Sequence, residues 1–266
     1  MDDIAKYNKE RWEELAQANV EYSRPFLDLD PRSAREVVDP EGMMGEVAGK
    51  DVLCLAGGGG QQSVAFALLG ANVTVLDLSE TQLNRDQEAA AHYHVNIETF
   101  QGDMRDLSRF ETAAFDIVWH AHSLNFVPDA RTVFREVARV LRVDGLYCLH
   151  CHNPFTHGVD DEQWDESGYR LKYPYTDGEI DLDNPYWDFE GGDGTRKRIK
   201  GPREFRHTLS TLLNSLIERG FVILAAWEET GDEPDPEPGT WGHFMAVTAP
   251  FLIFWASYRP YISATG

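Results

Sequence analysis

The 266-residue sequence contains few cysteines. There are only three, Cys54, Cys148 and Cys151, which is a small and odd number for a disulfide framework. Disulfides persist in oxidising compartments, whereas proteins of reducing compartments keep their thiols free. The cysteine content therefore predicts reduced thiols and a cytoplasmic protein.

Long apolar runs are also missing. No stretch approaches the roughly 18 consecutive apolar residues that a membrane-spanning helix needs. The sequence opens on the acidic segment Met1–Asp3, unlike the basic start of a signal peptide. We expect neither a membrane span nor a signal peptide.

Basic side chains are scarce, since 24 Lys and Arg stand against 45 Asp and Glu, for a net charge of −21. Nucleic acids and anionic membranes are bound through Lys and Arg on the contact face, so the charge argues against both as partners. The acid excess has a simpler interpretation as a solubility feature. The length suits one α/β domain with an elaboration.

The most informative stretch is Asp51–Gly60. The apolar run Val52–Leu55 has the length of a buried strand and is followed by Ala56 and four consecutive glycines. Ser63–Leu69 then predicts a helix, and a second apolar run, Asn72–Leu76, leads directly into an aspartate. Strand, glycine loop, helix, strand and acid form a βαβ unit that holds a nucleotide-like ligand at a helix N-terminus. A tight turn without a ligand is the alternative, which four glycines disfavour.

A dinucleotide site is one interpretation of this unit. Its fingerprint needs a third glycine or alanine, but that position falls on Gln61, Gln62 or Ser63 in the possible registers. The match to an NAD-binding protein is therefore poor.

The stretch instead resembles the first motif of class I S-adenosylmethionine-dependent methyltransferases. The loop glycines of that family map onto Ala56, Gly58 and Gly60. Two positions depart from the family pattern: Cys54 replaces the usual acid, and Ala56 replaces the first glycine.

A second motif follows the next helix and strand, which we expect over Ser79–Ala91 and Val95–Phe100. The pair Gly102 and Asp103 resembles the adenine-binding motif of the same family. The resemblance implies that Asp103 accepts a hydrogen bond from the adenine amine while Met104 packs on the ring. The alternative is that Asp103 is an ordinary turn residue.

The remaining core elements follow in the order of the family. A fourth strand, a helix, an Asp-Gly turn and a fifth strand are expected over Phe115–Trp119, Ala130–Leu141, Asp144–Gly145 and Leu146–His150. The resemblance covers roughly Asp51–His152. It implies an α/β, Rossmann-like, seven-stranded and mostly parallel sheet with an antiparallel last strand. The later elements would be a helix over Phe205–Arg219 and strands over Phe221–Trp227 and Pro250–Tyr258.

We divide the chain into three parts. Residues 1–49 are expected to form a helical segment, beginning with a helix over Asp3–Asn19, that covers the cofactor. Residues 50–152 and 201–266 form the methyltransferase core, and residues 153–200 form a small β-rich cap insert. The aromatic residues Tyr7, Trp12 and Tyr22 of the first part are expected to cover the cofactor or, alternatively, only to pack on the core.

The cap is both acidic and aromatic. Between Val159 and Asp193 there are twelve acidic and two basic residues, interleaved with aromatic ones. We expect the cap to lie over the carboxyl ends of the strands and to build the acceptor site, where its acids would favour a neutral or cationic acceptor. The alternative is a solvated surface decoration.

Histidines cluster at the ends of the fourth and fifth strands, at His120, His122, His150 and His152, with His157 just beyond. We take His120, His122 and His152 as catalytic candidates, because an imidazole can act as a general base or position a substrate. Structural histidines at strand ends are the alternative. A zinc or iron site built from the paired histidines is a further alternative, since imidazole suits both metals. No carboxylate or cysteine completes a known ligand spacing, so we predict no metal site.

The resemblance implies S-adenosylmethionine as the cofactor and in-line methyl transfer to a small-molecule acceptor. Backbone of the glycine loop would approach the methionine part, Asp77 would bind the ribose hydroxyls, and His120 would border the methionine side. The full set of expected cofactor-binding residues is Ala56, Gly57, Gly58, Gly60, Asp77, Leu78, Asp103, Met104 and His120. The alternatives are an adenosyl-ligand-binding protein without catalysis and an NAD-dependent oxidoreductase.

Overall fold

A seven-stranded sheet forms the centre of the protein in the computed structural model, which describes residues 1–266 except 160–163, 183, 191–194 and 261–266. The strand order is β10-β11-β5-β4-β1-β2-β3. Strand β11 runs antiparallel to both of its neighbours, β10 and β5. The other six strands share one direction. The strands are β1 (Asp51–Leu55), β2 (Asn72–Asp77), β3 (Ile97–Gln101), β4 (Phe115–His120), β5 (Leu141–His152), β10 (Phe221–Glu229) and β11 (Phe251–Tyr258).

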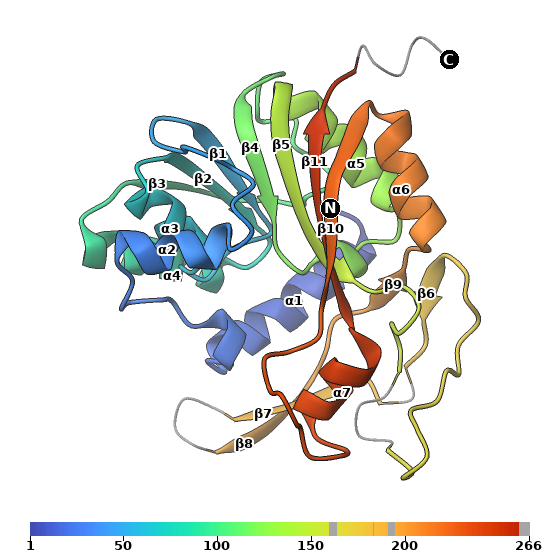
Figure 1. The fold of residues 1–266 in the computed structure, drawn as a ribbon. Coiled ribbons are helices and arrows are strands. Elements are labelled where there is room, and N and C mark those ends of the chain that lie inside the picture. Colours follow the sequence, from blue (N-terminus) through green and yellow to red (C-terminus); the bar gives the residue numbers. More distant parts are fainter. Residues whose placement is uncertain (160–163, 183, 191–194, 261–266) are drawn as a thin grey trace.

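Helices cover both faces of the sheet. On one face α5 (Ala130–Val140) and α6 (Leu209–Glu218) bury apolar residues such as Phe134 and Leu212 against the strands. On the other face α2 (Pro31–Val38), α3 (Gln62–Leu68) and α4 (Glu80–Tyr93) do the same (Figure 1). This three-layer arrangement buries both sides of the parallel strands, which explains their nearly continuous apolar runs.

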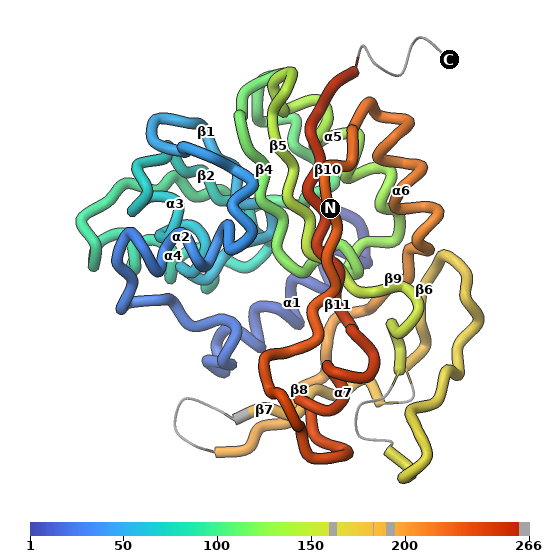
Figure 2. Tube along the Cα trace, in the orientation of Figure 1, coloured from blue at the N-terminus to red at the C-terminus, as the bar shows by residue number. Residues whose placement is uncertain are grey.

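The cap lies beyond the carboxyl ends of the parallel strands (Figures 1 and 2). Two antiparallel pairs build it, β6 (Gly178–Ile180) with β9 (Glu204–Arg206) and β7 (Tyr186–Glu190) with β8 (Arg196–Lys200). The N-terminal helix α1 (Asp3–Gln17) and the short 3₁₀ turns η1 (Glu21–Ser23) and η2 (Leu124–Phe126) also lie near this edge. A further helix, α7 (Trp241–Thr248), packs with the cap and was not expected from the sequence.

The fold class predicted from the sequence is confirmed, with two local corrections. The helix expected from Phe205 begins only at Leu209, because Phe205 pairs with Glu179 in the cap. The expected turn at Asp144 is instead an irregularity inside the long strand β5, where the register to β4 shifts and Asp144 has a φ of 63°.

The composition led to two expectations, on the cysteines and on a membrane span. All three cysteines are buried and free. Among the residues that the structure describes, no helix is long and apolar enough to cross a membrane. The division into an N-terminal segment, a core and a cap stays a prediction.

Candidate active site

The glycine loop connects β1 to α3 and is tied to the end of β2. Ala56 takes up a left-handed conformation with a φ of 49° and donates its N–H to the Leu76 carbonyl at 2.7 Å. The Gly58 N–H donates to Asp77 Oδ2 at 3.1 Å, and the Ser79 N–H donates to Asp77 Oδ1 at 2.8 Å. The acid at the end of β2 therefore holds the loop as well as facing the cavity.

A glycine is required at position 58 because side chains of neighbouring elements approach its Cα closely. A Cβ atom built there would lie 2.8 Å from Gln82 Cβ and 3.0 Å from Asp77 Cβ. The first distance is shorter than real Cβ contacts and the second is unusually tight, so a larger residue would push the loop away from its neighbours.

The sequence analysis missed Asp86, a fully buried residue of α4 that organises the loop from behind. Its carboxylate accepts hydrogen bonds from Gly59 N at 3.1 Å, from Gly60 N at 3.0 Å and from the Ser63 hydroxyl. Burial raises the pKa of Asp86 to about 7, although these hydrogen bonds act in the opposite direction. The Gly60 N–H thus points at Asp86, Gly60 is not among the residues that line the cavity, and its role in cofactor binding stays a prediction.

A cavity of about 360 Å³ opens in front of the loop. Its size falls in the range of small-molecule and cofactor sites. Nine residues expected at the site line it, namely Ala56, Gly57, Gly58, Asp77, Leu78, Asp103, Met104, His122 and His152. Other lining residues come from α1, from the loop and from distant segments, including Asn8, Trp12, Tyr22, Gln61, Gln82, Ser123, Trp187 and Phe251.

Asp77 is partly buried and lines the cavity. Burial raises its pKa to about 6, and the hydrogen bonds from backbone N–H groups oppose this shift. Each oxygen already accepts one backbone N–H and retains further lone pairs. A carboxylate placed in this way can accept from two neighbouring hydroxyl groups.

Asp103 is held by Arg105. The guanidinium of Arg105 donates to both carboxylate oxygens of Asp103 at 2.6–3.1 Å and also pairs with Asp2 at 2.8 Å. A carboxylate fixed by a two-pronged ion pair keeps one orientation towards the cavity. The sequence analysis did not identify this clamp.

His120 lies behind the cavity wall. It is completely buried, with Nδ1 2.7 Å from the Tyr147 hydroxyl and Nε2 2.9 Å from the Ser123 hydroxyl. Burial lowers its pKa to about 3, which keeps the imidazole neutral. His120 is not among the residues that line the cavity, and its expected place on the methionine side stays a prediction. Ser123, which does line the cavity, lies between His120 and the cavity.

A second cavity, of about 980 Å³, lies under the cap. It shares four lining residues with the first cavity, Tyr22, His152, Trp187 and Phe251. Trp187 comes from the cap strand β7, and Tyr22 from η1. The two cavities therefore meet at a junction, defined here by these four residues, to which the cap contributes directly.

Two histidine clusters include glutamates that the sequence analysis missed. His122 and His150 lie beside Glu229, and His152 and His157 lie beside Glu204. Both glutamates are more than 45 residues from the histidines they meet, so no spacing rule pointed to them. The fold thus brings a carboxylate to each histidine group, which no spacing in the sequence indicated.

Comparisons with known proteins agree with this geometry. A family model described as "Methyltransferase domain" matches residues 53–149. The chain is 35% identical over 247 residues to the uncharacterized methyltransferase YbaJ of Bacillus subtilis, covering 87% of this chain and 92% of that protein. It is 32% identical over 122 residues to the ubiquinone biosynthesis O-methyltransferase of Pseudomonas syringae pv. tomato, covering 46% of this chain and 51% of that protein.

Solved structures share the fold. An S-adenosylmethionine-dependent methyltransferase from Mesorhizobium loti superposes with a TM-score of 0.62 at 23% identity, covering 87% of this chain and 100% of that one. A second such enzyme, from Clostridium acetobutylicum, gives a TM-score of 0.62 at 16% identity, covering 87% of this chain and 93% of that one. With the glycine loop, the acid of β2 and the cavity in front of them, these matches establish that the chain belongs to the class I S-adenosylmethionine-dependent methyltransferases.

Proposed function

We propose that this methyltransferase binds a neutral small-molecule acceptor in the cavity under the cap and methylates it at the junction of the two cavities. The observation that supports this proposal is the set of four residues that line both cavities, Tyr22, His152, Trp187 and Phe251. A donor and an acceptor held in adjoining cavities need one shared wall at which they meet. Proximity and alignment at that wall can supply about 7–11 kcal/mol of the barrier.

S-adenosylmethionine, when bound, supplies a methyl group on a sulfonium that is already a good leaving group. The residues of the first cavity suit it. The backbone of Ala56–Gly58 is open to the methionine part, Asp77 accepts from the ribose hydroxyls, and Asp103 and Met104 hold the adenine. Helix N–H groups beside the loop would favour the cofactor's carboxylate without a basic side chain.

The charges of the second cavity favour a neutral acceptor. Two basic and two acidic side chains line it, so they balance one another: Arg170, Lys172, Asp188 and Glu204. Arg170 already pairs with Asp165 at 2.6 Å, and Glu204 with His157 at 2.8 Å. Burial raises the pKa of Glu204 and lowers that of His157 to about 3, so this pair favours its neutral forms and offers an ionic acceptor little opposite charge. The acid excess of the cap led to the expectation of a neutral or cationic acceptor. The balanced charges that line the second cavity restrict our proposal to neutral acceptors.

His152 is the group we assign to the acceptor. Burial lowers its pKa to about 3, so the ring is neutral and offers a lone pair to an acceptor O–H or N–H. His157 lies behind it, with ring centroids 4.4 Å apart, and contacts Glu204 through Nε2. The nearby Glu204 carboxyl favours the positive charge that His152 gains if it takes the acceptor's proton. His152 would thus orient the nucleophile by accepting its hydrogen bond. Because the ring's pKa of about 3 makes it a weak base, the acceptor's proton passes on to water as the new bond to the methyl carbon forms and the bond from that carbon to the sulfonium breaks.

A release assay for S-adenosylhomocysteine tests this assignment. Neutral phenols, alcohols and amides are offered beside carboxylates and phosphates, and we expect turnover only with neutral compounds. With the best acceptor, His152→Gln should lower kcat by about 10²–10⁴-fold while the affinity for S-adenosylhomocysteine stays unchanged. The matched control is His92→Gln, on the exposed side of α4.

Two outcomes would contradict the proposal. Turnover restricted to anionic acceptors would reject the neutral class. An unchanged kcat in His152→Gln, with a normal pH profile, would show that another group aligns the acceptor.

A further inference from the structure

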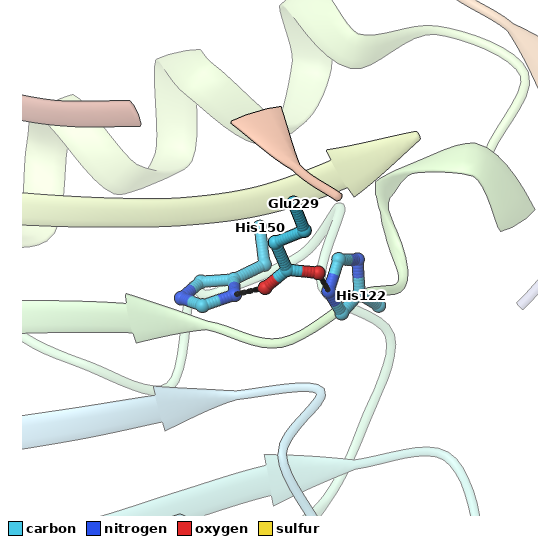
Figure 3. Close-up of side chains that lie close together, drawn as sticks. All are labelled: His122, His150 and Glu229. Atoms are coloured by element: carbon cyan, nitrogen blue, oxygen red, sulfur yellow. Dashed lines mark ion pairs between the residues drawn. The ribbon is translucent and has the colours of Figure 1, made fainter. Parts of the chain in front are cut away.

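One cluster at the carboxyl edge of the sheet takes no part in the proposed reaction. It consists of His122, just after β4, His150 in β5 and Glu229 at the end of β10. These strands run in the same direction, so their carboxyl ends reach the same edge. Figure 3 shows the three side chains turned towards one another, with the carboxylate of Glu229 between the two rings.

The distances between the ligand atoms of this cluster are longer than those of direct hydrogen bonds. His122 Nε2 lies 3.5 Å from Glu229 Oε2, and His150 Nδ1 lies 3.9 Å from Glu229 Oε1. All three ligand atoms lie within 4.8 Å of one another. Four-coordinate zinc with bonds of about 2.0–2.1 Å separates neighbouring ligand atoms by roughly 3.3–3.4 Å. Small side-chain rotations would therefore place all three atoms around one ion.

The second cluster provides a contrast. His157 Nε2 lies 2.8 Å from Glu204 Oε2, which is the distance of a direct hydrogen bond, and both residues are almost completely buried. A cation could enter that pair only by breaking this bond. In the His122 cluster the corresponding contacts to Glu229 are longer, at 3.5 Å and 3.9 Å, so a cation would displace weaker interactions there.

Neighbouring aromatic side chains hold the two imidazoles in place. Trp119 packs on His150 with ring centroids 4.6 Å apart, and Phe251 packs on His122 at 4.5 Å. A ligand set whose rings are already oriented loses little conformational freedom when a metal binds. Two imidazoles and one carboxylate form a donor set that suits zinc and other divalent transition metals.

We propose that His122, His150 and Glu229 bind one divalent transition-metal ion, of the zinc class, at the carboxyl edge of the sheet. The ion would link the ends of β4, β5 and β10. Because His122 lines the cofactor cavity and Phe251 lines the junction, the ion fixes one wall of the active site. Three protein ligands leave a further coordination position for water. This replaces the prediction from the sequence that the protein has no metal site.

Zinc titration of the chelator-treated full chain tests the proposal by calorimetry, without any methyl-transfer readout. We expect one zinc ion per chain in the unaltered protein. Glu229→Gln should weaken zinc binding at least about 100-fold, since even outer-shell changes cost 10–100-fold. Glu228→Gln is the matched control, because Glu228 is the exposed neighbour on the opposite face of β10. Glu204→Gln, in the second cluster, should also leave zinc binding unchanged.

Cobalt(II) provides a second measurement on the unaltered protein. Binding at a nitrogen and oxygen site of low coordination number should produce visible ligand-field bands that are stronger than those of aqueous cobalt. The proposal is overturned if no stoichiometric zinc binds, if Glu229→Gln binds zinc as the unaltered protein does, or if only Glu204→Gln loses it. Because none of these readouts needs an acceptor, failure here is distinguishable from failure of the proposed function.

Discussion

Asp86 allows a quantitative test of how the glycine loop is held. The side chain is fully buried, and its two oxygens receive the N–H groups of Gly59 and Gly60 and the hydroxyl of Ser63. We consider the change Asp86→Asn, which keeps the shape but removes the titrating group. It also replaces one acceptor oxygen with an N–H donor that faces other donors.

The size of the expected effect on stability follows from the raised pKa of Asp86. Burial moves the pKa of Asp86 from an ordinary value of 3.8 to about 7, and the charge of Asp77 adds to the effect. The shift is worth on the order of 4 kcal/mol. The folded protein holds this proton more tightly than the unfolded chain does. The stabilisation is therefore complete below about pH 4 and is lost as the pH rises through about 7.

Urea unfolding of both proteins at pH 5 and pH 8 measures the effect. At pH 5 the unaltered protein should be the more stable by about 1–3 kcal/mol, since the variant leaves a buried donor unpaired. By pH 8 this difference should fall by about 2–3 kcal/mol, because only the unaltered protein loses the proton. Glu88→Gln, an exposed position of the same helix, serves as the control and should show little pH-dependent change. A stability difference that is constant with pH, or grows as the pH rises, would refute the reasoning.

Two further predictions concern the cofactor cavity and use calorimetry with S-adenosylhomocysteine. Asp77→Ala should weaken binding by about 1.5–3 kcal/mol, the loss expected for hydrogen bonds to a charged acceptor, and an unchanged affinity would mean that the ribose is held elsewhere. Gly58→Ala places a Cβ 2.8 Å from Gln82 Cβ, so it should lower the free energy of unfolding by about 1–3 kcal/mol and weaken binding as the loop leaves Asp77. A Gly58→Ala protein with normal stability and affinity would show that the loop has room to relax.

Much of the fold could be predicted because it depends on local patterns. The apolar run of β1, the glycines after it and Asp77 at the end of β2 are neighbours in sequence, and each constrains the next through backbone geometry. The helix start at Ser79 is similar, because its side chain accepts from the Gln82 N–H three residues on. Local patterns were therefore sufficient for the βαβ unit, and the resemblance that they carry implied the sheet and the family.

The direction of individual side chains needed the tertiary structure. His120 and His122 are two residues apart, yet His120 is enclosed between Tyr147 and Ser123 whereas His122 lines the cavity. The chain leaves the strand after His120, so the alternation of strand faces no longer predicts where His122 points. The partner of the Gly60 N–H needed the tertiary structure for a comparable reason, since Asp86 comes from another helix.

Only the topology determines that Glu229 and Glu204 lie beside the two histidine clusters. Glu229 reaches His122 and His150 because β11 is inserted antiparallel between β5 and β10, which brings the end of β10 to the same edge. Glu204 reaches His157 through the pairing of β9 with β6 in the cap. Local sequence determined which strands and helices form, because those depend on neighbouring residues. Contacts between residues far apart in the chain depend on how the completed elements pack, and that only the tertiary structure decided.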